Sequence, residues 1–253
     1  MANNVNRISA TENRNLRLIA EVSAVCPLCG KKLQEIKNGR NIKLFDVAHI
    51  YPHKPTAQQL EVLKDIEPPS NVEALENLIA LCKPCHKTYD TFTTKEEYLK
   101  VLALKQELSA RYESRMELAE IPADEDIREV LNGLEHMPEG DLKDLRMDPL
   151  AVKKKIPNGV FQNKVLQLAT GYYSYLREQF QGMESRRTHK FAKIASQVSL
   201  SFRTAQEYEM IQEQIFDQIV EWMERKTGGR RAACEAVVAY FVQDCEVFDA
   251  LSE

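Results

Sequence analysis

Apolar residues in the first part of the chain switch between helical and strand spacing. Those from Leu16 to Val25 repeat at helical intervals, which predicts a helix that Thr11 caps and that reaches Cys26. Residues 42–50 are rich in strand formers and predict one strand, which the following prolines end. The first part of the chain is therefore expected to combine helices with strands.

Further elements are expected before residue 120. Residues 60–66 predict a short helix, and residues 78–81 predict a short apolar strand. The chain looks helical again after Cys85. The sequence Thr-Lys-Glu-Glu at 94–97 is a capping box, and it predicts the start of a long polar helix that reaches about residue 117.

The second half of the chain has only helical patterns. Residues 160–181 and 205–226 each carry an apolar stripe that needs a partner surface. Residues 231–248 are apolar nearly all round and predict a buried last helix. The excess of tyrosines around Tyr172 is expected to lie mainly in the core, with room for a partner.

Charge divides the chain into three segments. The net charge is −4, yet residues 1–118 sum to +2, residues 119–150 to −7 and residues 151–253 to +1. The acidic middle segment contains Asn-Gly and Pro-Glu-Gly sequences, which are typical of a connector with at most a short helix. We therefore predict an α+β domain over 1–118, a connector over 119–150 and an all-α domain over 151–253.

The composition excludes several classes of protein. A hydrophobic content of 43% is enough for a packed core, so a disordered tail protein is excluded. No run of apolar residues is long enough to span a membrane. The N-terminal residues are polar and rich in Asn, without an apolar signal core, so we expect a cytoplasmic protein that has no membrane contact.

Four of the six cysteines form two Cys-x-x-Cys pairs separated by 52 residues. In a reducing compartment such pairs are metal ligands before they are disulfides, and four thiolates suit tetrahedral zinc. A closed four-cysteine site has no open coordination position, so the zinc is expected to stabilise the fold without taking part in catalysis. The four are Cys26, Cys29, Cys82 and Cys85. The other two, Cys234 and Cys245, are expected to pack in the last helix.

The residues between the two pairs carry a second motif. Residues 46–52 read Asp-Val-Ala-His-Ile-Tyr-Pro, and residues 76–86 read Glu-Asn-Leu-Ile-Ala-Leu-Cys-Lys-Pro-Cys-His. Over residues 20–92 the chain resembles the HNH nuclease family. The resemblance implies a ββα-metal finger, in which a two-stranded hairpin and a helix hold one catalytic divalent cation. In this chain the zinc site is expected to stabilise the finger.

The resemblance also assigns roles to three residues. His49 falls at the position of the general base, and a neutral imidazole can take a proton from water at cellular pH. His86 falls at a metal-ligand position, and Asn77 at the position that holds the loop orienting His49. The cation is expected to be Mg²⁺ or Mn²⁺, which would neutralise charge on the scissile phosphate.

One position departs from the family pattern. Many members have an acidic residue just before the first His as a second metal ligand, and Ala48 stands there in this chain. Strand alternation places Asp46 on the same face as Ala48, so Asp46 is the expected replacement. His53 and Asp90 are further candidates. Other family members also have Ala at this position.

Basic residues cluster around the predicted finger in a segment of net positive charge. They are solvated surface in part, and they are also candidates for phosphate contacts that are independent of sequence. These residues are Lys31, Lys32, Lys37, Arg40, Lys43 and Lys54.

The second half resembles the C-terminal domain shared by effectors of ABC three-component systems, the Lamassu type of bacterial antiphage defence. The resemblance lies in Ile156 leading into the Tyr172-Tyr173 helix, in residues 215–223 and chiefly in residues 240–248, Tyr-Phe-Val-Gln-Asp-Cys-Glu-Val-Phe. It implies docking on an SMC-like ATPase and a small middle subunit. We also expect homo-oligomerisation of the active form, because one finger cuts only one strand.

These observations together predict a metal-dependent DNA endonuclease effector. Two alternatives stay open at this point: a zinc-ribbon adaptor that binds DNA without cutting it, and a toxin that cleaves RNA.

Overall fold

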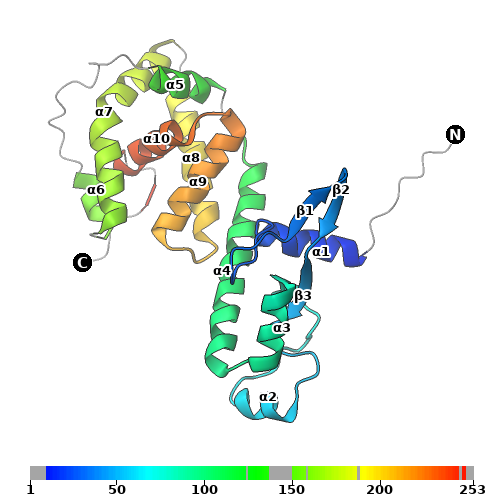
Figure 1. Ribbon diagram of the computed structural model, residues 1–253. Coiled ribbons are helices and arrows are strands. Elements are labelled where there is room, and N and C mark those ends of the chain that lie inside the picture. Colours follow the sequence, from blue (N-terminus) through cyan, green and yellow to red (C-terminus); the bar gives the residue numbers. More distant parts are fainter. Residues whose placement is uncertain are drawn as a thin grey trace. The chain divides into compact units, whose positions relative to one another are not determined.

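A computed structural model describes residues 10–123, 125–136, 150–157, 159–186, 189–244 and 247–248. The chain divides into two compact units, Met1–Tyr112 and Glu113–Glu253 (Figure 1). The boundary lies inside helix α4 (Lys95–Glu120), which begins in the first unit and ends in the second. The expected α+β fold with a helical C-terminal part is confirmed.

The first unit is a small mixture of helices and two-stranded sheets. Its elements before α4 are α1 (Ala10–Glu21), β1 (Gln34–Lys37), β2 (Arg40–Lys43), β3 (Phe45–His49), α2 (Ala57–Val62), the 3-10 turn η1 (Leu75–Asn77), β4 (Leu78–Cys82) and α3 (Lys83–Phe92). Strands β1 and β2 form one antiparallel pair, and β3 and β4 form another. Helix α3 packs on β3 and β4, so these three elements form the ββα unit.

The prediction of one strand over 42–50 is wrong, because two strands occupy this range. At Leu44 the backbone N–H donates to the carbonyl of Leu33, and the chain changes its partner from β1 to β4. Strand β3 pairs with β4, whose five residues are all buried. The change of partner takes the chain from an exposed hairpin into the core.

The first helix ends earlier than predicted. Helix α1 stops at Glu21, and Ser23 and Ala24 have left-handed backbones with φ of 52° and 58°. These residues turn the chain, and Val25 then pairs with Lys32 in an isolated antiparallel β-bridge. The apolar residues keep helical spacing beyond Glu21, but the helix itself has already ended. The predicted cap also fails, since Thr11 lies within the helix.

The other predicted elements of the first unit differ mainly at their ends. The strand expected at 78–81 is confirmed as β4. The helix expected at 60–66 is instead α2, because Thr56 forms a capping box with Gln59 and starts the helix earlier. The capping box of α4 is present: Thr94 N–H donates to Glu97, and Glu97 N–H donates to the Thr94 hydroxyl.

The second unit is built from helices around one hydrophobic core. Besides the end of α4, its elements are α5 (Asp126–Glu135), α6 (Leu150–Lys155), α7 (Val160–Arg186), α8 (Lys190–Gln206), α9 (Gln212–Thr227) and α10 (Arg231–Gln243). Helix α10 is buried along most of its length, as its apolar composition predicts. It ends at Gln243, earlier than the expected residue 248, and Phe248 has a left-handed backbone.

The single helix predicted over 205–226 is wrong. Helix α8 ends at Gln206 and α9 begins at Gln212, and between them Glu209 has a left-handed backbone with φ of 52°. Only residues 205 and 206 of the predicted range lie in α8, and the buried part of the stripe, Ile215, Ile219 and Trp222, lies on α9. Helix α8 itself has no counterpart among the predicted elements.

The predicted division into domains over 1–118, 119–150 and 151–253 stays a prediction. Helix α5 lies within the predicted connector, and residues 137–149 lie outside the described residues, as does Cys245. Cys234 is fully buried in the core of the second unit, as expected. In the part of the chain that the structure describes, no helix has the length and apolar composition needed to cross a membrane.

Candidate functional site

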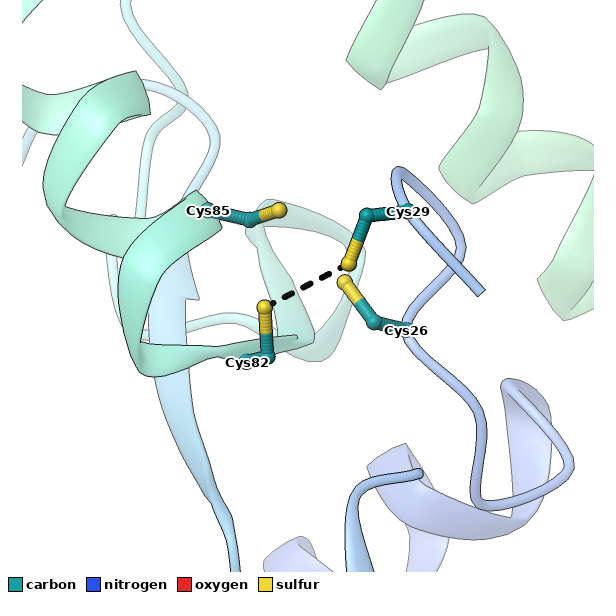
Figure 2. Close-up of side chains that lie close together, drawn as sticks. All are labelled: Cys26, Cys29, Cys82 and Cys85. Carbon is teal, nitrogen blue, oxygen red and sulfur yellow. Dashed lines mark hydrogen bonds between the residues drawn. The ribbon is translucent and has the colours of Figure 1, made fainter. Parts of the chain in front are cut away.

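The four predicted zinc ligands meet at one point of the first unit. The Sγ atoms of the four cysteines all lie within 4.8 Å of one another, and those of Cys29 and Cys82 are 3.5 Å apart (Figure 2). Tetrahedral zinc with Zn–S bonds of about 2.3 Å separates its sulfur ligands by about 3.8 Å. The spacing and the donor type therefore fit a zinc ion.

Two different local structures supply the thiols. Cys26 and Cys29 lie on a tight turn, in which Cys26 N–H donates to the Lys31 carbonyl and Gly30 N–H donates to the Cys26 carbonyl. Gly30 has φ of 73°, a backbone that favours glycine. Cys82 is the N-cap of α3 and Cys85 lies in its first turn, so the end of β4 and the start of α3 present both thiols together.

The thiols differ in how readily they ionise. The backbone N–H of Lys31 is the main cause that lowers the pKa of Cys29 to about 7. Burial raises the pKa of Cys82 and of Cys85 above the ordinary thiol value. One thiolate can therefore form near neutral pH, while the buried thiols need a cation to ionise, which is how a thiolate metal site behaves.

His49 lies at the end of β3, beside a carboxylate that the sequence did not single out. Its Nε2 atom is 2.8 Å from Oε1 of Glu73, and its ring stacks on His53 with centroids 5.3 Å apart. The other oxygen of Glu73 accepts a hydrogen bond from Arg14 Nη1 at 3.1 Å. The His49 hydrogen bond is the largest cause that lowers the pKa of Glu73.

This contact fixes the tautomer of the His49 ring. A carboxylate accepts hydrogen bonds, so Nε2 of His49 carries a proton and donates it to Glu73, and in the neutral ring the lone pair is then on Nδ1. The His49 side chain is 25% exposed, so water can reach it. The contact thus occupies Nε2 and leaves Nδ1 as the ring nitrogen that faces other partners.

Asn77 holds together the segments that carry His49 and Glu73. Its buried side chain accepts a hydrogen bond from Tyr51 N–H at 2.7 Å and donates to the Tyr51 and Val72 carbonyls at 3.0 and 2.9 Å. The Asn77 backbone carbonyl also accepts from Ile50 N–H. Asn77 therefore clamps the residues after His49 to the residue before Glu73.

His86 lies on α3 between two carboxylates. Its Nδ1 is 3.5 Å from Oδ2 of Asp46 on β3, and its Nε2 is 3.1 Å from Oδ2 of Asp90, one turn along α3. The two carboxylates approach different ring nitrogens, so the three side chains do not converge on one point. Carboxylate oxygen suits Mg²⁺ and Mn²⁺, and imidazole is a ligand of transition metals, so His86 with one of the two carboxylates, and not with both, fits a mixed site of this kind.

The structure thus forms three groups from the predicted site residues. The four cysteines form the first group. The second group consists of His49, His53 and Asn77, which lie near Glu73. In the third group, His86 contacts Asp46 and Asp90. The six basic candidates are all exposed. Glu73 was missed because it lies in a polar loop without periodicity, and the only local signal is the Asn71 side chain, which accepts from Glu73 N–H.

Comparison with protein families gives two matches. An HNH endonuclease model matches residues 26–94. The model for C-terminal domain 11 of the ABC-three component (ABC-3C) systems matches residues 114–248, which is more than half of the 253 residues. The chain belongs to this ABC-3C family. Searches of characterised proteins and of solved structures found no significant match.

The two matches confirm the fusion that the sequence motifs predict, an HNH domain followed by an ABC-3C domain. The HNH match covers the four cysteines and the three predicted catalytic positions. It supports nuclease activity in general, and the ABC-3C domain places the chain in a multi-component defence system.

Proposed function

We propose that this chain is a metal-dependent DNA endonuclease effector of a bacterial antiphage defence complex. The observation that carries the proposal is the hydrogen bond between His49 and Glu73 at the end of β3, within an HNH domain. A histidine held by a carboxylate, with its second nitrogen available, is suited to take a proton from an attacking water.

In the proposed mechanism His49 acts as the general base through Nδ1. Glu73 holds the ring and stabilises the imidazolium that forms when the proton arrives, as a carboxylate partner of a catalytic histidine does. Asn77 is a positioning residue, because its three side-chain hydrogen bonds hold the segment after His49 and the segment before Glu73 next to each other.

We assign the catalytic cation to His86 and Asp46. A metal-binding histidine usually donates its other ring N–H to a carboxylate, and Asp90 lies where it can accept from Nε2. Nδ1 then faces Asp46 and is the nitrogen that can bind the cation. When bound, Mg²⁺ or Mn²⁺ would supply charge neutralisation at the scissile phosphate and the leaving oxygen. Zinc at the four cysteines would hold α3 and β4 in place.

The catalytic proposal is tested by plasmid cleavage. The purified chain should nick or cut plasmid DNA with Mg²⁺ or Mn²⁺, and His49→Ala should lower the rate by a factor of about 100 to 10,000. His136→Ala, which changes an exposed histidine of the second unit, is the matched control. Equal cleavage by the wild-type chain and His49→Ala would refute the assignment. Binding without cleavage would favour a DNA-binding adaptor, and cleavage of RNA alone would favour a toxin.

The ligand assignment has its own test. Asp46→Asn should weaken Mn²⁺ binding more than Asp90→Asn, because an Asn at 90 still offers an oxygen to His86 Nε2–H. We expect a loss of roughly 10- to 100-fold for Asp46→Asn, measured by titration calorimetry on zinc-loaded protein. The reverse order would assign the cation to Asp90 instead.

The ABC-3C domain is proposed to dock the nuclease on partners of a Lamassu-type system. The partners that we propose are an SMC-like ATPase and a small middle subunit, acting in the cytoplasm where the DNA lies. Homo-oligomerisation through residues 151–253 would bring two fingers to opposite strands. Co-expression followed by size-exclusion chromatography tests both points: a chain that elutes alone and monomeric with its DNA substrate present would contradict them.

A further inference from the structure

The hairpin formed by β1 and β2 is nearly all exposed. Its four cross-strand pairs run from Gln34 with Lys43 to Lys37 with Arg40 at the tip. The connecting Asn38 and Gly39 both have left-handed backbones, with φ of 50° and 71°, which is the turn that matches the twist of a two-stranded ribbon. Figure 1 shows the ribbon projecting from the first unit, far from α2.

The hairpin contributes little to the stability of the fold. None of its eight strand residues is buried, and none belongs to the hydrophobic core of the first unit. Ile36, near the tip, is 79% exposed. An isolated two-stranded ribbon of this kind is only marginally stable in water. The ribbon thus presents a large aliphatic side chain near its tip, among exposed basic and amide side chains.

The base of the hairpin is nevertheless held firmly. Leu33, just before β1, is fully buried, and its N–H donates to the Ala24 carbonyl beside the first cysteine pair. On the other side of the ribbon, Leu44 N–H donates to the Leu33 carbonyl, and β3 then enters the core. The ribbon therefore projects from a fixed base between the thiol cluster and the strand that carries His49.

The chemistry of the hairpin is basic and rich in amides. Lys37, Arg40 and Lys43 outnumber the single carboxylate, Glu35. One face of the ribbon continues at its base into a hollow of about 430 Å³ between the ribbon and α1. Its lining combines three amides, one lysine, one carboxylate and apolar side chains: Asn15, Gln34, Asn41, Lys43, Glu12, Leu16, Ile19 and Phe45.

We infer that the β1–β2 hairpin enters the major groove of duplex DNA, an inference that rests on the proposed nuclease function. The major groove is about 12 Å wide and admits a two-stranded ribbon, whose strands lie about 4.8 Å apart. Lys37 and Arg40 at the tip contact the flanking phosphates. Asn41, on the face that also carries Ile36, lies toward the base edges, where an amide can pair with adenine and an aliphatic side chain can contact the thymine methyl.

The position of the hairpin fits a duplex that also reaches His49. Lys43 at the end of β2 is six residues from His49, so the two lie at most about 20 Å apart. One turn of B-DNA spans about 34 Å along its axis. A single duplex can therefore place its groove on the hairpin and a phosphate of a neighbouring half-turn at His49.

The test uses the full chain with His49→Ala, so that DNA is bound and not cut. The probe is a labelled duplex of about 30 base pairs, or three helical turns. Removing two phosphate contacts with Lys37→Ala and Arg40→Ala should weaken binding on the order of 10-fold at low salt. The slope of log affinity against log salt should become shallower by about 2. The control is Lys64→Ala with Lys100→Ala, which removes two exposed charges outside the hairpin.

The outcomes distinguish failure of the hairpin inference from failure of the proposed nuclease function. If the parent chain binds DNA and the hairpin variant binds as tightly with the same salt slope, the inference is overturned while the proposed function stands. If the wild-type chain neither binds nor cuts DNA, both fall. An RNA duplex of the same sequence has a deep, narrow major groove that a ribbon cannot enter, so an equal loss of affinity on RNA also overturns groove entry.

A neutral substitution tests contact with the bases. Asn41→Ala, in the cleavage-competent chain, should leave the salt slope unchanged and should alter the base composition around the cut sites on plasmid DNA by about 5-fold or more at the affected position. Sequencing of the cut ends measures this. An unchanged composition would overturn groove entry. All hairpin substitutions are at exposed positions, and a zinc content equal to that of the parent chain verifies the fold of each variant.

Discussion

Glu73 Oε1 lies 2.8 Å from His49 Nε2, although the two residues are 24 positions apart in the chain. The contact joins the end of β3 to the loop before η1, and Arg14 holds the second oxygen of the same carboxylate. The proposed base is therefore oriented by a residue that belongs to neither half of the sequence motif.

Replacing Glu73 should slow DNA cleavage without changing metal content. Glu73→Ala removes the acceptor for His49 Nε2–H, so the ring can rotate and change tautomer, and we expect a loss of rate on the order of 10-fold. Glu73→Gln keeps an oxygen acceptor and should lose less. Glu76→Gln, at an exposed position nearby, is the control. Faster cleavage by Glu73→Ala would mean that the carboxylate restrains His49 instead of preparing it.

The four-cysteine site should be required for the fold of the first unit. Cys82→Ser should abolish stoichiometric zinc in elemental analysis and unfold the unit, because zinc contributes on the order of 10 kcal/mol to small domains that depend on it. Cys234→Ser is the matched control, since this thiol is fully buried in the second unit and burial raises its pKa to about 12. Retained zinc in Cys82→Ser would contradict the site.

The buried ion pair between Glu21 and Lys105 should respond asymmetrically to mutation. Both side chains are 2% exposed, and Glu21 also accepts from Arg17 at 2.8 Å. Glu21→Ala leaves a buried ammonium without its carboxylate and should cost about 3 to 5 kcal/mol. Lys105→Met should cost less, because Glu21 keeps Arg17.

Zinc release during a urea titration reports unfolding of the first unit in these variants. Lys100→Ala, at an exposed position of α4, is the control and should unfold at the urea concentration of the wild type. Equal destabilisation by Glu21→Ala and Lys105→Met would show that Arg17 does not share the Glu21 charge.

Glu184 should make the stability of the second unit depend on pH. Its carboxylate accepts hydrogen bonds from the backbone N–H groups of His189 and Phe191 at the start of α8, and these bonds lower its pKa. A lowered pKa in the folded state means that the stabilisation is complete above the ordinary glutamate value and is lost as pH falls through the lowered one.

The difference in Tm between the wild type and Glu184→Gln should therefore be largest near neutral pH and should disappear in acid. Fluorescence of Trp222, the single tryptophan, reports unfolding of this unit. A constant difference across the pH range would show that the Glu184 charge does not contribute.

Local signals in the sequence predicted much of the fold and of the site. Paired Cys-x-x-Cys sequences predict a metal site from their spacing alone, and the apolar run at 78–81 reads as a strand from composition alone. The capping box at 94–97 fixed the start of α4, because its two hydrogen bonds involve only neighbouring residues.

The misses come from contacts that local patterns do not encode. The change of strand partner at Leu44 depends on Leu33, and the position of Glu73 depends on Asn77, which lies in a different segment from His49. Helix α8 is a different case, because its buried Ile194, Val198 and Phe202 recur at helical spacing and the pattern was there to read, although three serines lower its helix propensity. The hydroxyls of Ser196 and Ser201 bond to carbonyls one turn earlier, so residues that disfavour helices in isolation are accommodated there.

The two cysteine pairs join segments 53 positions apart, and the chain between them contains the hairpin, β3, His49 and Glu73. A cation held by the four thiolates closes this stretch into a ring, as a disulfide would. A cross-link that closes a loop of this length removes about 4 kcal/mol of chain entropy from the unfolded state. Unlike a disulfide, such a ring forms in a reducing compartment and opens when the metal is withdrawn, so the supply of that metal would decide whether His49, Glu73 and the β1–β2 hairpin are held as one assembled surface.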